Sequence, residues 1–306
     1  MKKIALLSLI GFAFATPSKK KIIYNANFIE SHFKYIPMST FNFGNCLDDG
    51  IETDPLPCKV RSVYAFYLYD REVSNAMYLQ FVNESGLAKN ITLPDTSVWN
   101  LKQGYMAPYV EYYFRHPAYA EYPVIGISHS QCLLFCEWLT KKYNADPKRK
   151  FKKAVFDLPA EEEWVCAAKG GLENSPFPWG GPNMQNTKGE WMANFLVMDQ
   201  SCIYRDNLKS VSGELVSEPI FVASKGGFTT GTIDVTAPVG SYWANDYGLF
   251  NMSGNVEEFV KEKGISKGGS WRDTGYYLRI QSREKYDDTN EKSVERGFRM
   301  VMRVEK

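Results

Sequence analysis

The sequence predicts one domain that mixes helices and short strands with a large amount of irregular backbone. Apolar residues recur at helical spacing in separate stretches that have their own start and stop residues. Between and after these stretches the chain is rich in Gly, Asn and aromatic residues, with only short strand signals. No repeat, low-complexity tract or linker divides the chain after Lys21, which favours a single domain.

Three helices are predicted from local signals. The first follows a cap at Ser74 or Asn75 and stops at Gly86. The third starts after Pro159 with three glutamates, where the helix dipole favours acidic residues, and ends at Gly170. The apolar faces of the first two helices consist of Tyr78, Phe81 and Val82, and of Cys132, Phe135, Cys136 and Leu139.

Two strands precede the first two helices. The stretch VRSVYAFYLYDREVSN, residues 60–75, alternates apolar and polar residues and predicts a strand before the Ser74 cap. The stretch PVIGIS, residues 123–128, predicts a short strand that leads into the second helix through a cap at Ser128 or Ser130. The irregular backbone that follows must be held by buried tryptophans, metals or disulfides, because its polar groups need partners.

Composition and charge exclude some classes of partner. Of the 306 residues, 44% are hydrophobic and 23% charged, an ordinary globular balance, whereas aromatics are high at 15%. The formal net charge is +1, so nothing favours a nucleic-acid or anionic-membrane surface. No stretch after the N-terminal segment is apolar enough to be a transmembrane helix.

The N-terminus has the pattern of a secretory signal peptide. Two lysines precede an apolar run over residues 4–14, and an A-x-A cleavage site ends at Ala15. The run is too short to cross a bilayer, and no cysteine near the cleavage site offers a lipid anchor. We expect a signal peptide (1–15), an N-terminal extension (16–35) and the domain (36–306). The protein is then periplasmic or associated with the outer membrane, and the alternative is a buried N-terminal strand.

Six cysteines in an exported protein can oxidise. Cys46 and Cys58 flank a turn-rich loop and could close a disulfide. Cys132 and Cys136 lie four residues apart on one helical face, where burial as small apolar residues is favoured over a bridge. The absence of a C-x-x-C motif excludes zinc-ribbon and thioredoxin sites. The pairing of the remaining two, Cys166 and Cys202, is open.

Common catalytic motifs are missing from the sequence. The only histidines are His32, His116 and His129, and no spacing among them or the carboxylates favours an iron or zinc site. His116 precedes Pro117 in an aromatic cluster, and His129 stands at a helix start, so we expect structural, capping or polar-surface roles. No G-x-S-x-G elbow or P-loop is present.

Six blocks, in order, resemble the formylglycine-generating enzyme (sulfatase-modifying factor) family. They are DREVSNAMYLQFV, YPVIGISHSQCLLFCEWL, FDLPAEEEWVCAAKGGL, FPWGG, TAPVGSYWANDYGLFNMSGNVEEFV and KGGSWRD…ERGFRMV. The resemblance runs from about Ile36 to Val304. It implies an α+β fold with little regular secondary structure, related to C-type lectins.

A narrower resemblance lies inside the first. The insert LPDTSVWNLKQGYMAPYVEYYFRHPAYAEYPVIGIS, residues 93–128, is similar to the gliding-motility and secretion proteins GldK and PorK. Members of that branch build the periplasmic ring of the type IX secretion system in Bacteroidota. The resemblance implies other secretion-ring or outer-membrane proteins as partners, and a homo-oligomeric ring as one assembly.

The family resemblance also bears on catalysis. Enzymes of the family hold copper with two cysteines after the Gly-Gly-Ser block, and the matching positions here are Asp273 and Leu278. Thiolates suit Cu(I), whereas carboxylate and aliphatic groups do not. No cysteine follows Cys202. We therefore expect no copper binding and no oxidase activity. The alternative is a divergent oxidase or other metal-dependent enzyme.

The residues that match the family pattern are oxygen donors of a calcium loop. In NMSGNVEEF, the side chains of Asn251 and Glu258 bracket the carbonyls of Gly254 and Val256. Mixed carbonyl and carboxylate ligands suit Ca²⁺. The alternative is that Asn251 and Glu258 only hydrogen-bond the loop. A second family site is incomplete: Asn194 and Phe195 match, but the acidic partner falls near Gly231, with Asp234 offset.

Two surfaces are predicted to bind partners. An aromatic cleft of Trp271, Asp273, Tyr276, Tyr277 and Arg279 would hold an extended peptide or a partner loop. In the insert, Trp99 and Tyr105 are predicted to contact another secretion component, because the aromatic density is too high for a solvated loop. We therefore expect a non-catalytic structural or binding component, and the alternative from another class is a solitary lectin-like binding module.

Overall fold

The computed structural model describes residues 24–44, 46, 56–101, 106–197, 203–205, 215–217, 235–288 and 290–305. The predicted signal peptide, Tyr105, Cys202, Gly231 and Asp234 lie outside the described residues. The helices are α1 (Ala26–His32), α2 (Asn75–Glu84), α3 (Lys89–Thr92), α4 (Ala107–Tyr112), α5 (His129–Ala145) and α6 (Glu161–Lys169), with 3-10 turns η1 (Thr96–Trp99) and η2 (Pro117–Tyr119). The strands are β1 (Phe33–Ile36), β2 (Ser39–Phe43), β3 (Lys59–Val63), β4 (Phe66–Tyr69), β5 (Lys153–Asp157), β6 (Ile203–Arg205), β7 (Leu215–Ser217), β8 (Glu257–Phe259), β9 (Ile265–Lys267), β10 (Arg283–Lys285), β11 (Arg296–Gly297) and β12 (Val301–Glu305).

The three predicted helices are confirmed as α2, α5 and α6. The Ser74 hydroxyl caps α2. The cap of α5 is Ser128, whose hydroxyl accepts the Gln131 N–H while the Gln131 side chain accepts the Ser128 N–H. Helix α6 ends at Gly170, which has a φ of 62°. These ends were predictable because each depends on residues within one turn of the helix.

Both strand predictions need correction. Residues 60–75 form two strands, because the chain turns at Tyr64 and moves from the β2–β3 hairpin into a different sheet at β4. Residues 123–128 form only an isolated bridge from Pro123 to Ser74. The extended backbone is interrupted at Gly126, where φ is 69° and a Cβ would lie 2.4 Å from the Asp95 carbonyl oxygen.

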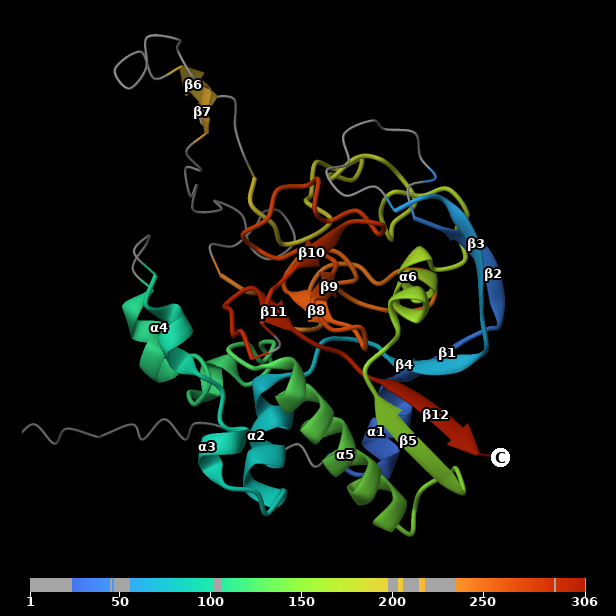
Figure 1. Cartoon of the computed structure of the whole chain (residues 1–306), viewed down its shortest axis with the longest axis vertical. Coiled ribbons are helices and arrows are strands. Elements are labelled where there is room, and N and C mark those ends of the chain that lie inside the picture. Colours follow the sequence, from blue (N-terminus) through green and yellow to red (C-terminus); the bar gives the residue numbers. More distant parts are fainter. Residues whose placement is uncertain are drawn as a thin grey trace, which may run out of the picture.

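The main sheet is antiparallel and has the order β1-β4-β12-β5. Strand β12, from the C-terminal end of the chain, lies between β4 and β5 (Figure 1). On one face of the sheet, α2 and α5 contribute Tyr78, Phe81 and Phe135 to the largest apolar cluster. On the other face, Trp164 of α6 packs into a second cluster with Leu68 and Val301. The sheet therefore has a buried core on each side.

The folded domain begins before residue 36. Strand β1 pairs with β4 from Phe33 to Ile36, and Ile29 of α1 is fully buried in the largest cluster. Residues 26–35, which the sequence placed in an extension, thus belong to the folded domain, and Ala26, Ile29 and Phe33 are buried in its core. The sequence did not predict β1 because this short edge strand has a weaker pattern of strand-forming residues than its partner β4.

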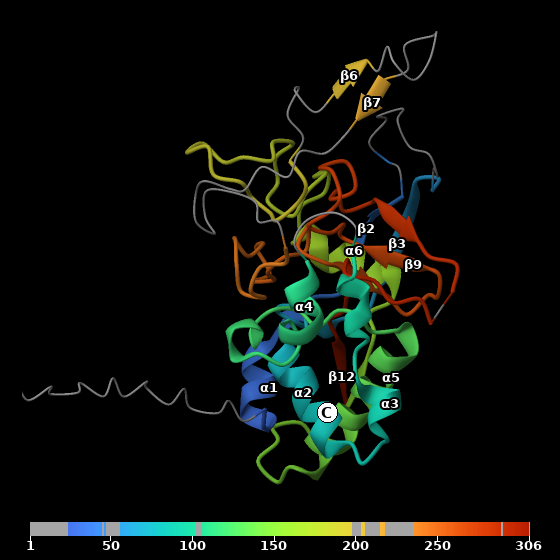
Figure 2. The same ribbon diagram turned by 90° about the vertical axis from the view of Figure 1, so that its left-hand side faces the viewer.

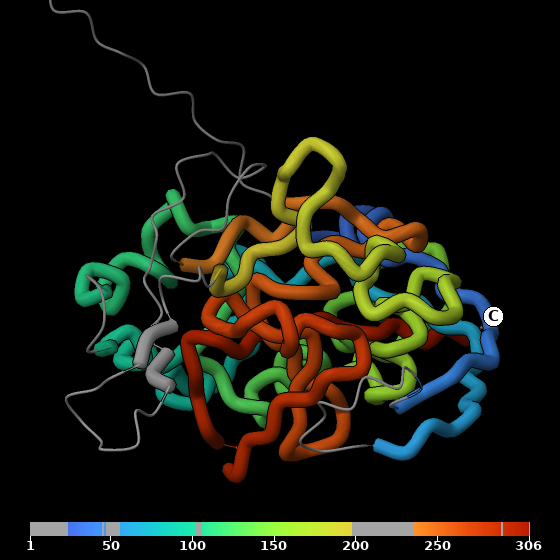
Figure 3. Tube along the Cα trace, turned by 90° about the horizontal axis from the view of Figure 1, so that it is seen from above, coloured from blue at the N-terminus to red at the C-terminus, as the bar shows by residue number. Residues whose placement is uncertain are grey.

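The second half of the chain has little regular structure and carries a small sheet of order β10-β9-β8-β11. Figure 2 shows helices α1 to α5 grouped in one part of the molecule and the loop-rich segments in another. In Figure 3 the chain from residue 235 onward, orange to red, crosses the middle of the molecule between the N-terminal strands and the helices. Buried loops in the middle of a domain must satisfy many backbone polar groups with partners from the protein itself.

The cysteine predictions are confirmed where the residues are described. Cys46 and Cys58 form a disulfide. Cys132 and Cys136 are free and buried, as is Cys166. Within the described ranges, no helix combines the length and apolar composition needed to cross a membrane.

Candidate functional site

The segment after Gly268 is a tightly packed turn. Gly268 and Gly269 have φ values of 97° and 65°. A Cβ on Gly269 would lie 2.9 Å from Leu278 Cδ1 and 3.0 Å from the Tyr277 backbone, so a larger residue would clash there. The glycine pair therefore brings residue 278 directly against the turn.

Asp273 and Leu278 both stabilise this turn. The Asp273 carboxylate accepts hydrogen bonds of 2.7 Å from the N–H and from the hydroxyl of Ser270. Burial raises the pKa of Asp273, against the effect of those two bonds. Leu278 is fully buried and packs in an apolar cluster with Phe177 and Phe195. One position thus holds a carboxylate bonded to its own turn and the other an aliphatic side chain, and neither is a ligand for Cu(I).

The predicted aromatic cleft is wrong for Trp271. That side chain is 2% exposed, stacks on Trp99 at 6.2 Å between ring centroids, and donates its indole N–H to the Val294 carbonyl. The Arg279 guanidinium lies 3.8 Å from the centre of the Tyr276 ring. The residues were grouped because they are close in sequence, yet the turn sends Trp271 inward. A binding role for Asp273, Tyr276, Tyr277 and Arg279 stays a prediction.

The predicted partner contact at Trp99 is also wrong. Trp99 is 1% exposed, and its ring lies 4.8 Å from that of Tyr113 in a cluster that includes Trp271. The insert is fastened to the domain by Asn75, whose side-chain NH₂ donates to the carbonyls of Tyr113 and Tyr119. The aromatic density of the insert therefore reflects packing on the domain and not a free surface around Trp99.

A buried ion pair joins strand β8 to the segment between β11 and β12. The Arg299 guanidinium bonds both oxygens of Glu258, at 2.6 to 2.9 Å. The Trp164 indole N–H donates to the same carboxylate at 2.7 Å. Arg299 also donates to the carbonyls of Phe250 and Tyr69, and neither member of the pair is more than 1% exposed. With its donors distributed in this way, the charge of Arg299 is compensated inside the domain.

A second buried acid lies beside this pair. Glu72 accepts hydrogen bonds from the side-chain NH₂ groups of Asn251, at 3.1 Å, and Asn255, at 2.7 Å. Burial raises the pKa of Glu72 to about 7, against the opposing charge of Arg299. Glu72 and Arg299 were missed as functional or structural residues, although both stand in blocks that resemble the family, DREVSN and ERGFRMV.

These contacts do not fit a calcium ion at the predicted ligands. Both oxygens of Glu258 already contact a cation, Arg299, which would repel a second one. Asn251 turns its NH₂ group toward Glu72. Gly254 serves close packing, since a Cβ there would lie 2.4 Å from the Asn194 carbonyl oxygen, and Val256 is fully buried. Asn251 and Glu258 are hydrogen-bonding residues in this geometry, as the alternative from the sequence states, but their partners lie outside the loop.

The other candidate ligands have structural partners too. The Asn194 side chain donates to the Val235 carbonyl at 2.7 Å, and Phe195 packs with Leu278. His129 is buried at the start of α5, and its Nε2 lies 2.9 Å from the Val260 carbonyl oxygen. His116 accepts the Ala118 N–H and caps η2. The described residues contain no group of three or more His, Cys, Asp or Glu side chains placed to hold a metal ion.

Three further acidic residues, Glu257, Glu284 and Glu295, lie close enough to Asp273 for their charges to interact. Burial raises the pKa of Glu257 to about 7, against the charge of Arg296, and raises the pKa of Glu295 as well. Burial, strengthened by the charges of Asp273 and Glu257, raises the pKa of Glu284 to about 7. Within the described residues the Glu284 Oε1 atom has no hydrogen-bond partner. These carboxyl groups therefore take up protons at a higher pH than ordinary carboxyl groups do.

Comparison with known proteins identifies the family of the chain. The model of the sulfatase-modifying factor enzyme 1-like domain matches residues 28–304. The chain belongs to this family. This chain is 28% identical over 252 residues to the formylglycine-generating enzyme of Bos taurus. The matched region covers 74% of this chain and 56% of the bovine protein. The family fold is α+β, as the sequence predicted.

Two further proteins show the range of the family and its fold. The inactive C-alpha-formylglycine-generating enzyme 2 of Bos taurus is 27% identical over 163 residues, which cover 50% of this chain and 40% of that protein. The chain therefore spans less than two thirds of the length of these curated relatives. The solved structure of PvdO from Pseudomonas aeruginosa has a TM-score of 0.59 at 17% identity, covering 88% of this chain and 93% of that one, and shows the shared fold.

Substitution of Glu258 tests whether the ion pair or a cation holds the loop. Glu258→Gln leaves the buried Arg299 without a counter-charge, and breaking such a pair typically costs about 3–5 kcal/mol. We expect a large fall in melting temperature that is the same in excess chelator and in millimolar Ca²⁺. A wild-type melting temperature that rises with Ca²⁺, together with loss of that response in the variant, would contradict the structure and restore the calcium site.

Glu284 gives a prediction for pH dependence. Because the folded protein holds the Glu284 proton up to about pH 7 and the unfolded chain releases it near its ordinary value of 4.5, the folded state binds more protons between these limits. Stability from this group is therefore lost as pH rises from about 4.5 to 7. Glu284→Gln should flatten the fall of melting temperature over that range, whereas Glu137→Gln, at an exposed position on α5, should leave it unchanged. Parallel curves for wild type and Glu284→Gln would disprove the assignment.

Proposed function

We propose that this chain is an exported, non-catalytic member of its family that acts as a structural or binding component of a type IX secretion and gliding machine. The non-catalytic part of the proposal rests on the structural roles of Asp273 and Leu278. One carboxylate is bonded to Ser270, and one leucine is fully buried between aromatic rings. Activation of oxygen by copper in this family needs two thiolates at these positions, and the sequence has no cysteine after Cys202.

A relative supports this part of the proposal. The inactive enzyme 2 of Bos taurus is named as inactive, so absence of activity has a precedent inside the family. The buried ion pair and the glycine-lined turn also keep the domain folded without help from the reactive groups, because their partners are all protein groups. A domain of this kind can retain its fold as a scaffold after losing catalysis.

The secretion part is supported by the insert, residues 93–128, which resembles GldK and PorK. Its inner side is fixed to the domain through Asn75 and Trp99. Its outer side carries α4, which has no buried residue and lies at the edge of the molecule far from the β2–β3 hairpin (Figure 1). Tyr112 is 47% exposed there and contacts the exposed His116 ring. An aromatic residue beside Arg115 on a fixed outer helix is a suitable anchor for a partner.

The catalytic part is tested by an oxidation assay. We expect the purified protein, with or without copper, to oxidise a cysteine-containing sulfatase-type peptide no faster than heat-denatured protein does. The double substitution Asp273→Cys with Leu278→Cys supplies soft ligands and is expected to bind Cu(I) more tightly than wild type in competition with a chromogenic chelator. A catalytically active relative serves as the positive control. Turnover by the wild-type protein would refute the non-catalytic proposal.

The partner surface is tested by substitution in the native host. Tyr112→Ala with Arg115→Ala should weaken co-purification of membrane components, by roughly 10-fold or more if the pair contributes about 1.4 kcal/mol or more. The melting temperature should change little, because both side chains are exposed. Co-purification is measured by quantitative mass spectrometry of crosslinked membranes.

Two matched variants complete that experiment. Tyr64→Ala removes a tyrosine that is 89% exposed on the opposite part of the molecule and should leave co-purification intact. Trp99→Ala removes a buried ring and should lower stability by about 3–5 kcal/mol. Equal effects of the Tyr64 and Tyr112 variants would argue against α4 as the contact surface, and a stable Trp99 variant would contradict the core role of Trp99.

A further inference from the structure

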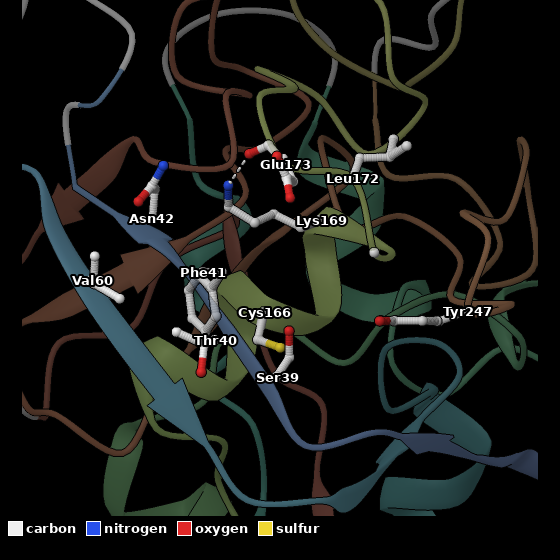
Figure 4. Close-up of a pocket in the computed structure, with 11 residues that line it drawn as sticks. Ser39, Thr40, Phe41, Asn42, Val60, Cys166, Lys169, Leu172, Glu173 and Tyr247 are labelled. Atoms are coloured by element: carbon white, nitrogen blue, oxygen red, sulfur yellow. Dashed lines mark hydrogen bonds between the residues drawn. The ribbon is translucent and has the colours of Figure 1, made fainter.

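A pocket of about 280 Å³ lies between strand β2 and the C-terminal end of α6 (Figure 4). Strand β2 contributes Ser39, Phe41 and Asn42 to its wall, and α6 contributes Cys166 and Lys169. None of its lining residues belongs to the turn that contains Asp273 and Leu278. The pocket is therefore a separate feature of the domain.

Lys169 brings a buried positive charge to this pocket. The residue is 5% exposed, and its Nζ atom donates to the Glu173 backbone carbonyl at 2.6 Å (Figure 4). An ammonium group has three donors, of which this bond uses one. Among the described residues no carboxylate lies within ion-pair distance of Lys169, whereas the buried Arg296 and Arg299 each have one. The C-terminus of α6 offers only a partial negative charge.

The neighbouring thiol does not supply the missing charge. Burial raises the pKa of Cys166 to about 11, against the effects of the Ser39 hydroxyl and Lys169. Cys166 is therefore a neutral thiol at physiological pH and not a thiolate partner for the lysine. Burial also lowers the pKa of Lys169 by more than the effects of Cys166 and Glu173 raise it. A bound anion would reverse this effect.

Strand β2 offers a second binding element at the same place. It pairs with β3 through all five of its residues, and in the described structure β3 is its only strand partner. The Gln281 side chain bonds the end of the other edge, where it donates to the Asn42 carbonyl and accepts the Gly44 N–H. The stretch of that edge before Asn42 has no strand partner in the described structure and is available to a peptide strand. Consecutive residues of β2, from Ser39 to Asn42, line the pocket, which therefore extends along the strand. Tyr247 and Leu172 form an apolar part of its wall.

We infer that this pocket binds the C-terminal carboxylate of an extended peptide, which pairs with Lys169 while the peptide backbone adds as a strand to the edge of β2. Addition of a peptide strand next to a helix is a common mode of peptide recognition, and capture of a terminal carboxylate gives it polarity. The carboxylate supplies the negative charge that Lys169 lacks. The exposed Glu173 side chain at the rim disfavours further acidic residues next to the terminus.

The test uses the wild-type protein and two forms of one probe. The probe is a fluorescein-labelled pentapeptide of valine and threonine, with either a free C-terminal carboxylate or a C-terminal amide. We expect the acid form to bind at least about tenfold more tightly than the amide by fluorescence anisotropy, since only the acid can pair with the ammonium. In ¹⁵N-labelled protein, the acid form should shift the backbone amide signals of β2. This comparison needs no substitution and so cannot fail through misfolding.

Substitutions then test whether Lys169 supplies the positive charge that pairs with the peptide carboxylate. Lys169→Met keeps the apolar stem and should remove the preference for the acid form, whereas Lys188→Met, at an exposed lysine, should retain it. Glu173→Gln should tighten binding of the acid form because a nearby negative charge is lost. Equal binding of acid and amide, or no shift of β2 signals at millimolar peptide, would overturn the inference. Propionate that competes as strongly as the peptide would overturn strand addition.

Discussion

The ion pair between Arg299 and Glu258 is the interaction on which the other loops depend. A guanidinium with no exposed surface bonds a carboxylate of β8, the carbonyl of Phe250 and the carbonyl of Tyr69. Trp164 of α6 donates to the same carboxylate. Four segments that are far apart in the sequence therefore meet at one buried charge. Because an unpaired charge would be very costly there, each segment is held in the position that supplies its partner.

This arrangement also explains how a domain with so much irregular backbone stays ordered. The loop from Asn251 to Asn255 has two non-glycine residues at positive φ, 50° and 67°, which cost conformational energy. Their side chains donate to Glu72, so strain in the backbone is offset by hydrogen bonds to a buried acid. Asn251, which suggested a metal ligand through its side-chain oxygen, thus contacts Glu72 through its NH₂ group.

The sequence was most informative where the physics is local. The caps of α2 and α5, the glycine end of α6 and the Cys46–Cys58 disulfide each depend on residues within one loop or turn. Long-range pairs were out of reach: Arg299 and Glu258 are 41 residues apart, and nothing in either residue type shows which partner it has. Burial was misjudged for Trp99 and Trp271 because aromatic residues are typical both of cores and of interfaces. The family resemblance gave the fold but not the orientation of those side chains.

The position of β12 has a consequence for how the protein is made. In the described structure, β12 connects β4 and β5 within the sheet, because it pairs with both of them. The core on either side of the sheet cannot close before that segment arrives, so folding must wait for chain that is more than 140 residues downstream of β5. Placing β12 between β4 and β5 makes the main sheet depend on strand pairs that are far apart in the sequence, which slows folding through topology alone.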